Sequence, residues 1–203
     1  METRTNLSKY ESMYDTFDKG HDREHMEGVR RFAVELAKKY CPKKEEIVYV
    51  SATLHDVGLS IEGRESHHLN GFKIIKKDKN IEQAYSKEDF CLILEGILEH
   101  RASVGKPKSI VAKIVSDADR AYADMKTHLK RSYDYNSQKY PKLTHNEVLN
   151  KVAEYMIPKF DTNGTGTRLY FDESKERILG KGKDILKVFK KRNYKEIDKI
   201  LNL

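Results

Sequence analysis

The apolar residues of this chain recur at the spacing of an α-helix, and this periodicity constrains its fold more than any other feature. In the segment from His21 to Tyr40, apolar side chains occur at Val29 and then three, four, seven, eight and eleven residues later. An α-helix makes one turn in 3.6 residues, so these positions share one face, and Pro42 predicts the end of the helix. The segment therefore predicts an amphipathic helix with one buried side.

The same periodicity predicts helices along most of the remaining chain. We expect them at about residues 44–58, 66–77, 86–101, 109 to as far as 133, and 146–160, followed by two short helices. The hydroxyls of Ser86 and Ser109 are suited to cap two of them. Only residues 161–173, which contain an Asn-Gly turn signal, break the pattern, and we expect a loop or a short β-hairpin there. The sequence predicts an all-α fold.

The composition is that of a folded, well-solvated protein, with 38% hydrophobic residues and 35% charged residues of both signs. The N-terminal residues lack an apolar stretch, and no segment approaches the roughly 20 apolar residues of a membrane span. Cys41 and Cys91 lie far apart in the sequence, so we expect two buried free thiols in a reducing compartment. These features predict a soluble, cytoplasmic protein with no membrane partner.

The net charge is +7, and much of the positive excess lies in residues 175–195. The lysines and arginines of this segment surround apolar residues at helical spacing, among them Leu186 and Phe189. An exposed amphipathic helix explains this pattern better than a nucleic-acid interface does. Nucleic acid is therefore not an expected partner.

Ionisable residues occupy inner positions on four of the predicted helices. His25 lies four residues before Val29, and His55, His100 and Asp119 lie at the inner edges of the later apolar stripes. Burying an ionisable group is costly unless the group is paired or coordinated. A lone buried histidine is usually satisfied by a hydrogen bond, but four such residues on four helices favour convergence on a bound cation.

Imidazole and carboxylate groups together indicate a divalent transition metal, namely Fe, Mn, Ni, Co or Zn. A structural zinc site would use a cluster of thiolates, and Mg²⁺ would take more carboxylates and waters. His25, His55, Asp56 and one late aspartate supply four ligands, which leaves coordination positions for water and substrate. The sequence therefore predicts a catalytic metal site.

The order of these residues resembles the HD superfamily of metal-dependent phosphohydrolases. The signature of that family is a histidine, then an adjacent His-Asp pair, then a distant aspartate, on an all-helical core. The similar region spans about residues 20–123: DREHMEGVRRFAVELA contains His25, ATLHDVG contains His55 and Asp56, and IVSDADRAY contains the last aspartate.

The length of the chain bounds its organisation. A length of 203 residues suits one domain, or one domain with a modest C-terminal extension. We expect an HD-domain helical bundle at residues 1–135 and a C-terminal helical extension at residues 136–203 packed on the same domain.

Some members of the superfamily bind two metal ions and carry two more histidines, and the segments ESHHLNG and ILEHRAS resemble the elements that hold them. The resemblance selects His67, four residues before Gly71, and His100 as ligands of a second ion, with Asp56 bridging the two ions. His68 is an alternative to His67. The centre is therefore expected to hold one or two ions.

The last aspartate of the signature has two candidates. Asp117 and Asp119 both border the apolar stripe of their helix, so periodicity does not distinguish them. The family pattern places an alanine before the ligand and often an arginine after it, which favours Asp119 in the tripeptide Ala-Asp-Arg.

The resemblance implies hydrolysis of a phosphoester or phosphoanhydride bond in a small phosphorylated substrate, for which a nucleotide is the favoured choice. His55 and Asp56 would be the central catalytic residues, because they would hold the metal. A bound metal ion lowers the pKa of water and neutralises charge on phosphoryl oxygens. Arg101 and Arg120 adjoin proposed ligands and are predicted to bind the substrate phosphate. For Arg120, a salt bridge to a nearby aspartate (Asp117 or Asp124) is an equal alternative.

The alternative function is that of a non-catalytic HD protein that senses a phosphorylated ligand or partner. A third hypothesis, nucleic-acid binding through the late basic segment, has no need of buried histidines. The chain lacks the GYP motif of the HD-GYP branch, which argues against cyclic di-GMP hydrolysis. The sequence makes no prediction of the oligomeric state.

Overall fold

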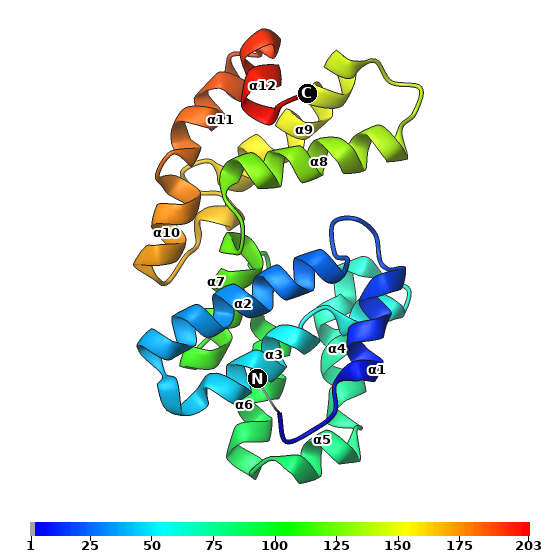
Figure 1. Ribbon diagram of the computed structural model, residues 1–203, viewed down its shortest axis with the longest axis vertical. Coiled ribbons are helices and arrows are strands. Elements are labelled where there is room, and N and C mark those ends of the chain that lie inside the picture. Colours follow the sequence, from blue (N-terminus) through cyan, green and yellow to red (C-terminus); the bar gives the residue numbers. More distant parts are fainter. Residues whose placement is uncertain (1–2) are drawn as a thin grey trace. The chain divides into compact units, whose positions relative to one another are not determined.

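The computed structural model describes residues 3–203, and every regular element in that range is a helix (Figure 1). The predicted all-α fold class is confirmed. The α-helices are α1 (Ser8–Glu11), α2 (Arg23–Tyr40), α3 (Glu45–Leu54), α4 (His67–Lys76), α5 (Lys79–Ala84), α6 (Lys87–Glu99), α7 (Ile110–Ala121), α8 (Met125–Lys139), α9 (His145–Phe160), α10 (Asp172–Leu179), α11 (Gly182–Lys190) and α12 (Tyr194–Leu201). Short 3₁₀ helices connect them: η1 (Ser12–Thr16), η2 (Pro42–Lys44), η3 (Val57–Ser60), η4 (Arg64–Ser66) and η5 (Thr165–Thr167).

The chain forms two compact units, Met1–Tyr122 and Ala123–Leu203. The boundary lies in the break between α7 and α8, where the carboxylate of Asp124 accepts a hydrogen bond from the amide of Thr127 and caps α8. The single helix predicted to run as far as residue 133 is therefore two helices. The boundary between the units precedes residue 135, the predicted end of the core. The packing of the C-terminal extension on the core stays a prediction.

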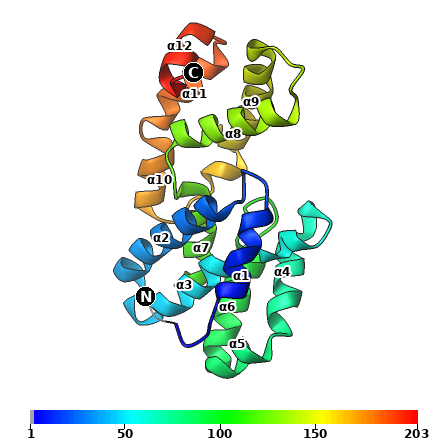
Figure 2. The same cartoon turned by 45° about the vertical axis from the view of Figure 1, so that its right-hand side comes forward.

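Helix α3 is the centre of the N-terminal unit. Seven of its ten residues are buried, because its apolar residues run almost without interruption and α2, α6 and α7 pack around it. Helix α2 is instead buried along the single face predicted from Val29, Phe32 and Leu36. Helix α1 also contacts α3, and Figure 2 shows it in front of α3.

The helix starts predicted at Ser86 and Ser109 are confirmed. The Ser86 hydroxyl accepts a hydrogen bond from the amide of Asp89 at the start of α6, and the Ser109 hydroxyl accepts one from Ala112 at the start of α7. Each hydroxyl satisfies one of the amides that a helix leaves unpaired in its first turn.

The C-terminal unit is built on α8 and α9, which pack against each other and against α11. Three helices end the chain instead of the two predicted, since α10 ends before Gly180 and Asn193 caps α12 after α11 has ended. Residues 161–171 form a loop that contains η5, and α10 begins at Asp172, so of the two structures expected for residues 161–173 the loop is the one that occurs.

The net charge of the protein lies entirely in the C-terminal unit. Residues 1–122 contain 21 basic and 21 acidic side chains, whereas residues 123–203 contain 18 basic and 11 acidic ones. Within this unit α11 buries Leu186 and Phe189 and exposes lysines on its other side, as expected of an exposed amphipathic helix.

Cys41 and Cys91 are both free thiols, as expected, but Cys91 is exposed and Cys41 is only half-buried, so their predicted burial is wrong. Among residues 3–203, none of the helices combines the length and apolar character that a membrane crossing requires.

Asp78 links two short helices of the N-terminal unit that the sequence analysis did not predict. Its carboxylate caps α5 by accepting hydrogen bonds from the amides of Asn80 and Ile81. It also contacts the Lys9 ammonium and accepts a hydrogen bond from the Tyr10 hydroxyl, both on α1. Burial raises the pKa of Asp78, but its contacts with Lys9 and Tyr10 and the two amides lower it to about 2.

We expect the Asp78→Asn variant to be less stable than wild type near neutral pH, and the difference to depend on pH. The pKa of Asp78 falls from 3.8 to about 2 on folding, so its ionised form stabilises the fold above about pH 4. That contribution is lost as the pH falls from about 4 to about 2. Asparagine keeps an oxygen that can cap α5 but loses the acceptor for Lys9 and Tyr10, so the part of the difference that changes with pH is the part that reports the charge. Urea unfolding of both proteins between pH 7 and pH 2 measures the difference, and a difference that does not change with pH contradicts the assignment.

Candidate metal centre

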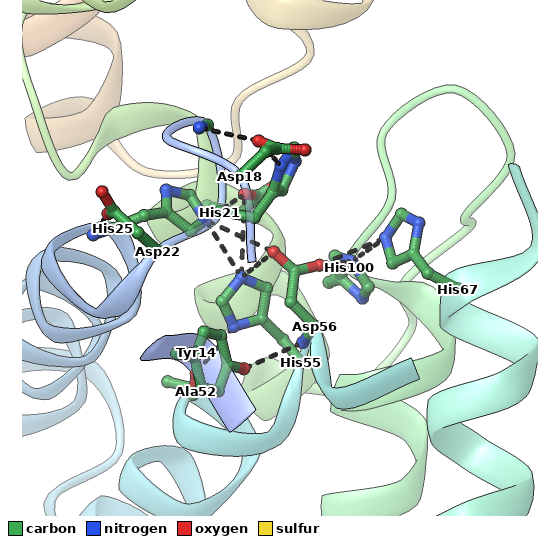
Figure 3. Close-up of polar contacts among 12 residues, drawn as sticks. Tyr14, Asp18, His21, Asp22, His25, Ala52, His55, Asp56, His67 and His100 are labelled. Atoms are coloured by element: carbon green, nitrogen blue, oxygen red, sulfur yellow. Dashed lines mark hydrogen bonds and ion pairs between the residues drawn. The ribbon is translucent and has the colours of Figure 1, made fainter. Parts of the chain in front are cut away.

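Four helix ends of the N-terminal unit bring their polar side chains to one point (Figure 3). His25 lies in the first turn of α2, His67 begins α4, and His55 and His100 directly follow the last residues of α3 and α6. Asp56 follows His55. All five residues are at least nine-tenths buried: His25, His55, Asp56, His67 and His100.

The Asp56 carboxylate lies at the centre of this cluster, and each of its oxygens faces two histidines. Oδ2 lies 3.1 Å from Nε2 of His55 and 3.5 Å from Nε2 of His25. Oδ1 lies 3.2 Å from Nε2 of His67 and 3.5 Å from Nε2 of His100. The cluster therefore forms two groups of potential metal ligands that share Asp56.

Three of the histidines are oriented in the same way. Nδ1 of His55, His67 and His100 lies 2.7 Å from the carbonyl oxygen of the residue three positions earlier in each case. Each Nδ1–H donates to that carbonyl, which leaves the lone pair of Nε2 directed at Asp56. A hydrogen bond to the far nitrogen is how proteins commonly orient histidines that bind metal.

The nitrogens that face Asp56 are too close to one another for neutral imidazoles alone. Nε2 of His67 lies 2.9 Å from Nε2 of His100, and Nε2 of His25 lies 3.2 Å from Nε2 of His55. Oδ2 of Asp56 is buried and accepts no well-formed hydrogen bond within residues 3–203. Converging lone pairs and a buried carboxylate need a positive charge among them. The residues present therefore fit one or two bound cations.

The pKa values of the cluster show how strongly its members interact. Burial lowers the pKa of His55, but the charge of Asp56 and the hydrogen bonds of the ring raise it to about 9. Burial lowers the pKa of His67 to about 4. Burial raises the pKa of Asp56, but the charge of His55 and the contacts with the other histidines bring it well below 3.8, so Asp56 stays ionised. A cation must displace the proton from His55, so cation binding weakens as the pH falls.

A family model for the HD domain matches residues 23–124 of this chain. The chain belongs to the HD domain family. No curated protein and no solved structure matches the chain. The recognition made from the signature residues is therefore confirmed for the family, and the roles of individual residues remain to be argued from geometry.

Asp119, rather than Asp117, lies beside the HD histidines. Its Oδ1 is 3.4 Å from Nε2 of His25 and 3.9 Å from Nε2 of His55, and about a quarter of its side chain is exposed. Burial raises the pKa of Asp119, but the hydrogen bond and the charge of His25 lower it by more, to well below its usual value of 3.8. The carboxylate is therefore ionised. Its position on the last turn of α7 places this partly exposed carboxylate beside the HD histidines.

Arg120 is buried against residues that support the site. Its guanidinium donates hydrogen bonds to Oδ1 of Asp117 (3.2 Å) and to the Ser116 hydroxyl (2.9 Å). Ser116 in turn donates to the backbone carbonyl of His100 (2.8 Å). This geometry favours the alternative considered for Arg120, a salt bridge to Asp117. Substrate binding by Arg120 stays a prediction.

The choice between His67 and His68 and the position of Arg101 both involve the segment around η4. His67 belongs to the cluster around Asp56, whereas His68 is buried next to it with its ring centre 5.8 Å from that of His67. Arg101 is partly exposed and donates hydrogen bonds to the carbonyl and the carboxylate of Glu65. Arg101 therefore lies close to the segment that carries His67.

The sequence analysis did not predict a polar cluster beside His25. His21 packs its ring edge-to-face on that of His25, with ring centres 5.7 Å apart. Nδ1 of His21 lies 3.1 Å from Asp18, and Arg64 donates a hydrogen bond to Asp18 and contacts the His21 ring. Asp18 and His21 precede the first residue of α2 and lie on no apolar stripe, so helical periodicity does not identify them.

Gly58 determines how closely α4 approaches the His-Asp pair. A Cβ atom at this position would lie 1.9 Å from the carbonyl oxygen of His67 and 2.4 Å from the amide nitrogen of Gly71. Both atoms belong to the backbone of α4, so they cannot move aside as a flexible side chain would. The absence of a side chain at Gly58 allows the first turn of α4 to bring His67 to Asp56.

We expect Gly58→Ala to destabilise the protein by about 3 kcal/mol or more, because an added atom in a packed region forces backbone shifts. Gly63→Ala is the comparison variant. Its φ of 101° strains any other residue by about 1–2 kcal/mol, but its Cβ would contact nothing. Urea unfolding gives both free energies of unfolding. Equal losses in the two variants would contradict the proposed role of Gly58.

Proposed function

We propose that this HD-domain protein is a metal-dependent phosphohydrolase that cleaves a phosphoester or phosphoanhydride bond in a small phosphorylated molecule, with a nucleotide as the favoured substrate. The observation that supports this most is the position of Asp56 between two pairs of histidines. A structural site would enclose one ion with four ligands and leave no room for a reactant.

The two groups of ligands support a centre of two divalent cations. His25, His55 and Asp56 would hold one ion, with the partly exposed Asp119 as a fourth ligand beside His25. Asp56, His67 and His100 would hold the other. Nitrogen and oxygen donors favour Fe, Mn, Ni, Co or Zn. Such ions, when bound, polarise a phosphoryl oxygen and lower the pKa of water, which supplies the nucleophile for hydrolysis.

The side chains themselves supply position and charge. Asp56 and His55 are fixed at the end of α3, so the bridging carboxylate and its neighbouring imidazole do not need to reorganise during the reaction. Their burial excludes water from the inner side of the site. Arg101, held by Glu65 next to His67, is the predicted ligand of the substrate phosphate, because a guanidinium matches the geometry of a phosphate.

The alternative is a non-catalytic protein that uses the same centre to sense a phosphorylated ligand. A cytoplasmic location remains part of the proposal, based on the free cysteines and on the soluble substrate class. Nucleic acid is not proposed as a partner.

Replacement of His67 or of its neighbour His68 tests the two-ion centre directly. Wild type should bind two equivalents of Mn²⁺, and His67→Ala should bind one, because, of these two neighbours, it is His67 whose Nε2 lies 3.2 Å from Asp56. His68→Ala is the matched control and should keep two. Turnover of p-nitrophenyl phosphate should fall by about 100-fold or more in His67→Ala, beyond the usual effect of residues around the ligands.

Metal content by plasma mass spectrometry and steady-state kinetics give both readouts for the two histidine variants. Loss of one ion from His68→Ala, with His67→Ala unaffected, would reverse the assignment.

Asp56→Ala should lose both ions and all measurable turnover, since both groups share this carboxylate. Circular dichroism shows whether the variant keeps its helical content. A panel of nucleotides and phosphomonoesters assayed with the Mn²⁺-loaded wild type tests catalysis itself. A protein that binds metal and a phosphorylated ligand but turns over none of the panel would be the sensing alternative. If Asp56→Ala kept its metal and its activity, the assignment of the site would be wrong.

A further inference from the structure

Tyr14 lies outside the segment that matches the HD domain, yet its hydroxyl contacts the backbone of the His-Asp pair. It belongs to η1, and its side chain is fully buried. The hydroxyl donates a hydrogen bond to the carbonyl oxygen of Thr53 (2.8 Å) and accepts one from the amide of Asp56 (3.2 Å), as Figure 3 shows for Asp56.

These two hydrogen bonds lie where α3 ends. The helix stops at Leu54, and the last carbonyls of a helix have no partner within it. The carbonyl of Ala52 accepts a hydrogen bond from Nδ1 of His55, and the carbonyl of Thr53 accepts one from the Tyr14 hydroxyl. The amide of Asp56 is bound by the same Tyr14 hydroxyl. One side-chain oxygen thus joins a carbonyl and an amide on the two sides of the turn in which the chain leaves the helix.

This turn decides where the Asp56 carboxylate points. The backbone of Asp56 has φ −106° and ψ 5°, which is outside the α-helical region. A continued helix would carry the side chain elsewhere around the helix axis. Because Asp56 must face both pairs of histidines, a small rotation of its backbone would lengthen the contacts of Oδ1 or of Oδ2.

The Tyr14 ring is itself fixed. Its centre lies 5.2 Å from that of Phe17 in an edge-to-face contact and 6.4 Å from that of His55. The position of the hydroxyl is therefore set by packing, which makes Tyr14 a rigid support for the turn.

We propose that Tyr14 is a positioning residue of the metal centre: its hydroxyl fixes the backbone of Asp56 so that each carboxylate oxygen faces one pair of histidines. The inference rests on the proposed function, because it assumes that these residues bind cations. Tyr14 does not touch the substrate or the ions.

The test compares Tyr14→Phe with Tyr10→Phe. Each variant loses one buried hydroxyl, but the Tyr10 hydroxyl binds Asp78 between α1 and α5, away from the metal centre. Isothermal titration with Co²⁺ measures affinity, and the visible absorption of bound Co²⁺ reports the geometry of the ligands. Tyr14→Phe should bind Co²⁺ about 10–100-fold more weakly with a changed spectrum, as removal of supporting hydrogen bonds typically does. Tyr10→Phe should match wild type in both.

Each result has a defined meaning. If wild type bound no Co²⁺, the proposed function and this inference would both fail. If wild type bound Co²⁺ and Tyr14→Phe had the same affinity and spectrum, the inference alone would fail. Should Tyr14→Phe not fold, nuclear magnetic resonance of the Co²⁺-free wild type provides a second measurement. A cross peak between the Tyr14 hydroxyl proton and the Asp56 amide proton supports the inference, and rapid solvent exchange of that amide overturns it.

Discussion

One buried carboxylate, that of Asp56, sets the requirements for the rest of the site. An ionised group without access to water has to be surrounded by donors or by positive charge. Here four imidazoles face its two oxygens. Two of these rings, His55 and His100, are held by carbonyls in the last turns of α3 and α6, where a helix leaves its carbonyls without a partner. The His67 ring is held by the carbonyl of Arg64 in η4. For His55 and His100 the same contact thus completes a helix end and directs Nε2 at the carboxylate. This is why these two candidate ligands lie directly after the last residues of α3 and α6.

The long helices were predictable because each has enough turns for its apolar stripe to repeat. The short helices α1 and α5 were missed, since four and six residues are too few to show a period, and helices of this length depend on tertiary contacts. Those contacts come here from Asp78, which reaches both. The break between α7 and α8 was missed for a different reason. Ala118, Ala121, Met125 and Leu129 are all buried at helical spacing, so the period continues across a break that is made by the cap at Asp124.

The residues of the candidate site were predicted from the sequence more completely than the helices of the C-terminal unit. Four ionisable residues on apolar stripes predicted that their side chains meet at a bound cation, because burying each of them alone would be costly. The choice between His67 and His68 depended on the approach of α4 to Gly58, a backbone contact that no side-chain pattern encodes. The choice between the two aspartates depended on Arg120, which pairs with Asp117 and leaves the next aspartate of α7 to face the histidines.

The same pairing bears on which arginine meets a substrate. Arg120 is buried, and its hydrogen bonds connect through Ser116 to the carbonyl of His100, so moving its guanidinium to a phosphate would disturb a candidate ligand. Arg101 is bound instead by Glu65, whose carboxylate is 84% exposed. An exposed ion pair contributes only about 0–1 kcal/mol, so a phosphate can displace that carboxylate at little cost. We therefore expect Arg101, rather than the buried Arg120, to recognise a phosphorylated molecule, while the bonds of Arg120 connect it through Ser116 to the backbone of His100.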